Sequence, residues 1–356
     1  LTPLIFDSSI QIPENRVISA RILYQLTIIG TTLVVITVPY DAALNAHENM
    51  LVYSIASITE SVIRLIGAFI LLVYSKDKLI FYGGLLITIR LISMIIKSSY
   101  CRNHYKETLI SIKSSDKALM KDMFSFAFWN MFGALAMTTR SQGVAIVMNT
   151  FFGVIINAAF GIAIQISGQL QNFTATISKA MSPQIMQRAG SGDKNGMISL
   201  SLKQCKYASF LLAYAIIPLL FSMPFILKVW LKDVPEYSIV FCSLVLIVSL
   251  VQQSTNGIMS LIQATGVVRN YQVAVSLIMI LNIPLAYVLL RIGVSAPFVI
   301  VGMIAIEVIA AFVRVLFAKI LTSLSIHTFV KKVTLPIIIV YAIPCIVLIS
   351  VKNVFF

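Results

Sequence analysis

The fold of the chain is best approached from residues 138–184, which read TTRSQGVAIVMNTFFGVIINAAFGIAIQISGQLQNFTATISKAMSPQ. They are long and apolar enough for parts of two membrane-spanning helices, with a bend expected at Phe151–Gly153. Polar and small residues recur within them at a spacing of three or four: Asn157, Gly161, Gln165, Gln169 and Asn172. This spacing predicts one stripe of a helix. Because an unpaired donor or acceptor in hydrocarbon costs several kcal/mol, we expect the stripe to line a polar cavity.

The composition is that of a polytopic, all-α membrane protein. The 356 residues are 59% hydrophobic and only 11% charged, whereas about 25% charged residues are usual in soluble proteins. Long apolar runs without period-two alternation argue against a β-barrel. The excess of 27 Lys+Arg over 13 Asp+Glu is explained by cytoplasmic loops and anionic lipid, so membrane lipids are expected partners and nucleic acid is not.

Metal, cofactor and enzyme signatures are missing from the sequence. The cysteines are far apart with no CxxC spacing, and the three histidines lie in unrelated places. No P-loop, GxSxG, HExxH or dinucleotide-binding motif occurs. We therefore expect no metal site, no cofactor and no enzymatic activity.

About ten segments are long and apolar enough to span a membrane. These are 18–40, 50–74, 78–98, 123–147, 151–178, 207–230, 238–263, 270–290, 296–318 and 333–351.

Two short matches indicate an internal repeat. IPEN at 12–15 resembles VPEY at 234–237, and NAHENMLVYSIAS at 45–57 resembles ATGVVRNYQVAVS at 264–276. We interpret 123–318 as a six-helix bundle and 1–98 as the last three helices of an equivalent bundle. The remaining segments are a cytoplasmic linker, 99–122, and a further transmembrane helix in 319–356. An even number of spans per unit predicts two parallel-related repeats, the first of them incomplete, with about 100 residues expected upstream of Leu1.

Several charged residues lie within the predicted spans, where they are costly and therefore candidates for function. Glu60 and Arg64 are four residues apart and can pair on one helix face, or can face a cavity. Arg90 can extend to the headgroups or contribute to a cavity.

Arg140 lies deep in its span with no partner within one turn. It can pair with a residue of another helix or contribute to a cavity, and we favour the cavity. Glu307 has Arg314 two turns further along the same face, which favours a structural pair over proton coupling through Glu307.

Five stretches resemble polysaccharide-export flippases, the Wzx-type members of the multidrug/oligosaccharidyl-lipid/polysaccharide (MOP) superfamily found in capsule and O-antigen loci of Bacteroides-like bacteria. They are 38–60, FSFAFWNMFG at 124–133, 149–185, WLKDVPEYSIVF at 230–241 and QATGVVRNYQ at 263–272. The resemblance covers nearly the whole chain, but such proteins have three more helices before the point that corresponds to Leu1.

The resemblance implies two six-helix bundles around a cavity with alternating access, in the bacterial inner membrane. The implied cargo is undecaprenyl-pyrophosphate-linked oligosaccharide, and glycosyltransferases and a polysaccharide polymerase are further candidate partners. Arginines suit a pyrophosphate, and amide side chains suit sugar hydroxyls. We therefore expect substrate-binding residues among Arg140, Asn157, Gln165, Gln169, Arg64 and Arg90, and coupling residues at Glu60 or Glu307.

Two other functions compete with this interpretation. A MATE-like drug or cation antiporter needs unpaired acids in its cavity, so Glu60 and Glu307 would line the lumen. A membrane-embedded polysaccharide polymerase needs a large periplasmic loop with arginines, and the sequence has none.

The positive-inside rule gives a testable topology. The loops richest in Lys and Arg are 99–122, 179–206, 264–269 and 319–332, which we expect in the cytoplasm, with 231–237 in the periplasm. Cysteines placed at Ser114 and Asp233 should be labelled from the cytoplasm and the periplasm respectively. Periplasmic labelling of position 114 would contradict this orientation.

Overall fold

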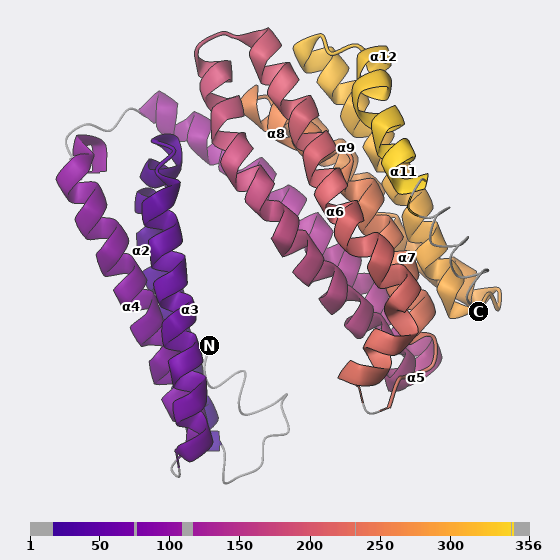
Figure 1. Cartoon of the computed structure of the whole chain (residues 1–356), viewed down its shortest axis with the longest axis horizontal. Helices are drawn as coiled ribbons and strands as arrows, with labels where there is room; N and C mark the ends of the chain where they lie inside the picture. Colours follow the sequence, from indigo (N-terminus) through magenta and orange to yellow (C-terminus); the bar gives the residue numbers. More distant parts are fainter. Residues whose placement is uncertain (1–16, 75–76, 109–116, 232, 343, 345–356) are drawn as a thin grey trace. The chain divides into compact units, whose positions relative to one another are not determined.

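The computed structural model describes residues 17–74, 77–108, 117–231, 233–342 and 344. Every secondary-structure element within these ranges is helical, which confirms the all-α class (Figure 1). The chain divides into two compact units, Leu1–Ser115 and Asp116–Phe356. Their boundary lies within the predicted linker 99–122.

Unit 1 consists of three long helices and one short turn of helix. These are α2 (Val17–Ala46), α3 (Met50–Val73), α4 (Lys78–His104) and η2 (Lys106–Thr108). The Asn49 side chain begins α3 by accepting from Val52 N at 3.4 Å, and Asp77 begins α4 by accepting from Leu79 N at 2.9 Å. Such caps satisfy backbone donors that a helix leaves free at its start.

A buried ion pair joins α2 to α4 in unit 1. Lys97 Nζ lies 2.7 Å from Asp41 Oδ1 and 5.0 Å from the centre of the Tyr53 ring. Only 7% of the surface of Lys97 is exposed. Its ammonium group is therefore part of the helix packing at this end of unit 1.

Unit 2 contains the remaining helices. They are α5 (Lys117–Gly190), α6 (Lys194–Trp230), α7 (Ser238–Gln253), α8 (Asn256–Ala264), α9 (Arg269–Ile280), α10 (Asn282–Arg291), α11 (Ala296–Thr322), α12 (Ile326–Phe329) and η3 (Val330–Thr334). Two apolar clusters form the core. One contains Phe160, Leu212, Phe241 and Ile300, and the other contains Ile185, Leu261, Tyr271 and Phe329.

The predicted bend at 151–153 is confirmed. α5 is two helices that meet at Gly153, whose φ of 74° and ψ of −169° are not helical. This backbone conformation is essentially restricted to glycine, because a Cβ would clash there. The bend separates the half of α5 that carries Arg140 from the half that carries the Asn and Gln residues.

Asp193 fixes the turn between α5 and α6. Its carboxylate accepts from Gly196 N at 2.8 Å and from Arg188 Nη1 at 2.5 Å. These two contacts hold the pKa of Asp193 below its ordinary value.

Within the described residues, seven helical segments are long and apolar enough to cross a membrane. They are Arg21–Ala46, Met50–Val73, Lys78–His104, Lys194–Trp230, Ser238–Ala264, Arg269–Arg291 and Ala296–Thr322. The predicted spans 123–147 and 151–178 form the two halves of α5. The predicted span 333–351 is described only in part, because residues 343 and 345–351 lie outside the described ranges.

The turns of unit 2 alternate between its two ends (Figure 1). The turns after α5, α8 and α11 lie at one end, and these belong to segments predicted to be cytoplasmic. Ser114 and the repeat match at 12–15 lie outside the described residues. The orientation and the repeat therefore stay predictions.

The bend gives a test of backbone strain. Gly153→Ala should lower the free energy of unfolding by about 1–3 kcal/mol, because alanine disfavours the positive φ. Gly161→Ala is a matched control in the same helix: its Cβ would meet nothing within 4 Å, and alanine favours a helix. Thermal unfolding of the purified protein in detergent measures both. An equal melting temperature for the two variants would contradict the strain at Gly153.

Candidate functional site

A buried cluster of three charges lies inside unit 2. Glu307 of α11 is 0% exposed. Its Oε1 accepts from Arg314 Nη1 at 2.8 Å, and its Oε2 accepts from Arg140 Nη1 at 2.6 Å. Arg314 also donates to Thr255 Oγ1 at 3.0 Å. The cluster thus connects the first half of α5, the junction of α7 with α8, and α11.

The sequence-based expectations for this cluster are partly met. The expected Glu307–Arg314 pair is present, because seven residues are two turns of one helix. Arg140 has its partner on another helix, 167 residues further along the chain. Among the described residues, no group of three or more His, Cys, Asp or Glu side chains could hold a metal ion.

The charges of the cluster do not balance. Two guanidinium groups face one carboxylate, so the cluster carries one net positive charge when all three groups are ionised. A buried carboxylate is tolerated only when it is paired and hydrogen-bonded. Glu307 meets that condition twice over, and it is therefore held as an anion.

A line of small polar contacts joins the second half of α5 to α7 and α8. Ser167 and Ser249 hydroxyls lie 2.7 Å apart, and Gln171 Nε2 donates to both at 3.1 and 3.3 Å. Further along, Asn256 donates to Ser178 at 3.0 Å. The Ser182 and Ser260 hydroxyls follow at 3.1 Å. Such contacts satisfy polar groups that lipid could not satisfy.

Two polar cavities follow this line. The first, of about 200 Å³, is lined by Arg140, Ser141, Ser167, Gln171, Ser249 and Gln252 together with apolar side chains. The second, of about 250 Å³, is lined by Gln171, Asn172, Thr174, Ala175, Ser178, Gln252, Gln253 and Asn256. Gln171 and Gln252 line both cavities, so a single polar tract extends from the charge cluster toward the start of α8.

Of the α5 residues on this tract, the sequence analysis named Arg140 and Asn172 and missed the others. Ser167, Gln171, Thr174, Ser178 and Ser182 recur at a spacing of three or four, which is the same signal as the stripe at 157–172. They form a second stripe on the same helix. Serine and threonine also occur in helices without any functional role. They were therefore a weaker indication of a polar surface than the Asn and Gln residues of the stripe at 157–172.

The predicted stripe lies outside the core of unit 2. Asn157 is half-buried, and Gln165, Gln169 and Asn172 are exposed. Arg140, by contrast, is only 8% exposed, and Asn157, Gln165 and Gln169 are not among the residues that line its cavity. Asn172 lines the second cavity and so borders the polar tract, whereas Asn157, Gln165 and Gln169 line neither cavity and lie on a different surface from Arg140. That Arg140 and the stripe meet in one substrate cavity stays a prediction.

Glu60 has an ion-pair partner on a neighbouring helix rather than Arg64, which was one of the two alternatives considered. Glu60 Oε2 lies 3.6 Å from Arg90 Nη1 on α4, and Arg64 is exposed. The physical reason is that α3 packs against α4, so Arg90 reaches the half-buried carboxylate from the neighbouring helix. Arg90 is thus engaged in an ion pair within unit 1.

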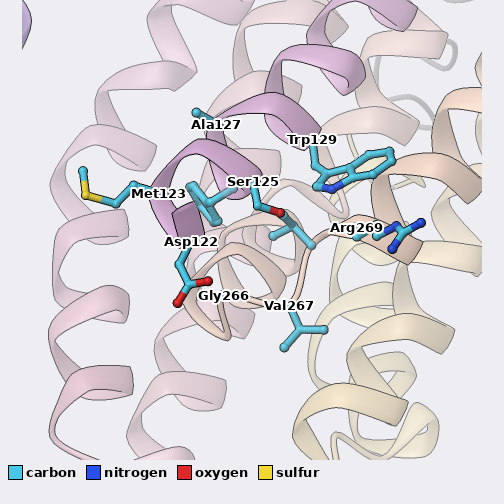
Figure 2. A pocket seen from close by; sticks show the side chains of 10 residues that line it. Asp122, Met123, Ser125, Ala127, Trp129, Gly266, Val267 and Arg269 are labelled. Atoms are coloured by element: carbon cyan, nitrogen blue, oxygen red, sulfur yellow. The ribbon is translucent and has the colours of Figure 1, made fainter. Parts of the chain in front are cut away.

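A larger, amphipathic pocket opens at one end of unit 2 (Figure 2). It has a volume of about 730 Å³ and is lined by Asp122, Met123, Ser125, Phe126, Ala127, Trp129 and Gly266–Arg269. The Arg269 guanidinium lies 5.1 Å from the centre of the Trp129 ring, and Figure 2 shows the two side chains next to each other. An apolar wall beside one arginine suits a molecule with an apolar part and an anionic head.

The chain is similar to solved transporter structures. One is a MOP superfamily transporter from Pyrococcus furiosus, with a TM-score of 0.75 at 14% identity over 90% of this chain and 74% of that chain. A second is a multidrug resistance MATE family transporter in an outward-facing conformation, with a TM-score of 0.75 at 13% identity over 90% and 73%. A third is MATE in the bent conformation, with a TM-score of 0.75 at 14% identity over 90% and 73%. The chain therefore has the fold of these transporters.

Sequence comparison identifies no relative. No family model matches the chain, and no curated protein matches it.

The charge cluster predicts unequal effects of its members on stability. Glu307→Gln leaves two buried guanidinium groups without a carboxylate and should lower the free energy of unfolding by about 3–5 kcal/mol. Arg140→Gln should cost less, because Arg314 still pairs with Glu307 and the cluster becomes neutral. Glu236→Gln, at an exposed acid, is the control. Thermal unfolding in detergent measures all three, and a larger loss for Arg140→Gln than for Glu307→Gln would contradict the charge argument.

Proposed function

We propose that this protein is a membrane transporter that moves a pyrophosphate-linked lipid oligosaccharide across the bacterial inner membrane by alternating access. The observation that carries the proposal is the state of the two mid-span acids. Glu307 is paired with two arginines and Glu60 with one. Neither acid is left free to attract a cationic cargo, and the buried charge of unit 2 is positive.

An anionic cargo fits this charge distribution. A pyrophosphate in hydrocarbon is costly, and a positive interior lowers that cost. The arrangement does not require Arg140 to touch the cargo, because a buried charge acts over distance in a low dielectric. We further propose, more specifically, that Arg140 binds the pyrophosphate directly.

The exposed stripe of α5 supplies groups for the sugars. Gln165 and Gln169 are exposed amides on the second half of α5. An amide offers both a donor and an acceptor, which is what a sugar hydroxyl needs. Lipid would leave these amides unsatisfied, so a hydrated glycan is a better neighbour for them than an acyl chain.

The pocket at Trp129 and Arg269 supports a lipid-linked cargo. Its lining joins apolar side chains to one guanidinium group, although Asp122 also lies on its wall. The pocket belongs to the end of unit 2 that we predict to be cytoplasmic. The linked lipid, with its anionic head, would be presented from that leaflet.

A MATE-like drug or cation antiporter is the second candidate function. The observation in its favour is the fold, which is shared with a multidrug resistance MATE transporter. The fold is also shared with a MOP transporter described by a binding pocket of reverse polarity, which suggests a different function for that protein. The paired state of Glu60 and Glu307 favours the anionic cargo here.

Complementation tests the proposal. The full-length protein carrying Gln165→Ala and Gln169→Ala should export lipid-linked glycan in a flippase-deficient strain roughly thirtyfold less than the unsubstituted protein, since each of the two lost hydrogen bonds is worth about 1 kcal/mol. Gln184→Ala, at an exposed amide elsewhere on α5, is the control and should export normally. Membrane levels of each variant are measured by blotting.

The two candidate functions predict opposite results. Full glycan export by the double variant, at equal membrane levels, would contradict a role for the stripe. Failure of the unsubstituted full-length protein to export glycan, combined with proton- or sodium-driven resistance to cationic drugs, would replace the proposed function with the antiporter.

A further inference from the structure

We infer that the polar cavity beside Arg140 is a binding site for a small inorganic anion of the size of chloride. The cavity has a volume of about 200 Å³ and lies entirely within unit 2. The inference concerns a small anion alone and does not depend on which cargo the protein carries.

The first argument is the uncompensated charge. Arg140, Glu307 and Arg314 are the only charged residues among the buried residues that the structure describes in unit 2. Their sum is one positive charge, enclosed by apolar helices. A buried charge without a counter-charge is expensive, and water compensates it less well than an anion does. A monovalent anion would make the cluster neutral.

The second argument is the supply of free donors. Arg140 uses one of its terminal nitrogens for Glu307 and Met279, which leaves Nε and Nη2 without a hydrogen-bond acceptor among the described residues. Gln253 Nε2, on the adjoining cavity, is buried and has no partner. Guanidinium and amide N–H groups are the usual ligands of anions.

The third argument is the shape of the tract. At about 30 Å³ per water molecule, the cavity holds several waters, or one halide with part of its hydration shell. A metal cation of similar size would be repelled by the net charge, and the remaining polar wall, Ser141, Ser167, Ser249 and Gln252, carries no carboxylate.

The surroundings of the cavity contain few groups that titrate. Glu307 and Arg314 of α11 are not on its wall: Glu307 pairs with Arg140 and with Arg314. Tyr271, on α9, lies beside Arg314. The lining from α5 and α7 is otherwise serine, glutamine, glycine and apolar side chains. Arg140 is thus the group on which anion binding depends.

Halide-dependent unfolding tests the inference. The purified full-length protein is heated in detergent with increasing sodium chloride, the ionic strength being kept constant with sodium gluconate, whose anion is several times larger than chloride. Chloride should raise the melting temperature by a few degrees in a saturable manner, because a ligand that binds only the folded state stabilises it. Arg140→Gln should abolish the response, and Arg291→Gln, at an exposed arginine of the same unit, should keep it.

A second variant leaves the charge cluster intact. Gln252 lines both cavities, and Gln252→Leu should raise the chloride concentration at half-saturation roughly tenfold through the loss of one polar contact. This variant tests the site even where Arg140→Gln fails to fold. An anomalous difference peak for bromide in the cavity of a crystal would locate the anion directly.

Three outcomes would overturn the inference. The melting temperature of the unsubstituted protein could be equal in chloride and gluconate, which would leave the cavity to water. The response could persist in Arg140→Gln, or the half-saturation could be unchanged in Gln252→Leu, and either would place the anion elsewhere. Glycan export is not measured in this experiment, so its result is independent of the proposed function.

Discussion

The structure of unit 2 depends on one buried carboxylate. Glu307 lies on α11 with no exposed surface, and an isolated ionised carboxylate in that environment would be strongly destabilising. Its two arginine partners remove that cost, and they do so from two helices. Arg140 brings the first half of α5 to α11, and Arg314 reaches the junction of α7 and α8 through Thr255. These hydrogen bonds hold α5, α11 and the junction of α7 and α8 in one relative arrangement.

The bend at Gly153 makes this arrangement compatible with a second polar surface. Because of the bend, the continuous segment Lys117–Gly190 forms two helices that make different contacts. The first half of α5 delivers the buried Arg140, and the second half contacts α7 and α8 through a line of small polar residues. The opposite side of the second half carries exposed amides. Two stripes on one helix therefore separate the packing of the bundle from the surface on which we propose the cargo lies.

The fold by itself does not decide the cargo. Similar structures include a multidrug resistance MATE transporter and a MOP transporter with a reversed pocket polarity, so charge within the bundles is the feature to compare. In this chain each mid-span acid is neutralised by arginine. We propose that this distribution favours an anionic cargo and that the interior of unit 2 holds a counter-anion.

The sequence by itself determined the helical membrane class, the bend at Gly153, the stripe on α5 and the spacing that pairs Glu307 with Arg314. Each of these is a property of one segment, and the helical period fixes the angles between residues of the same helix. Only the tertiary structure decided that Glu60 pairs with Arg90 and leaves Arg64 exposed, that Arg140 pairs with Glu307, and that Ser167 meets Ser249. The choice among partners on different helices depends on which faces pack together and how far each helix is shifted along its neighbour. Periodicity within a single helix contains no information about either quantity.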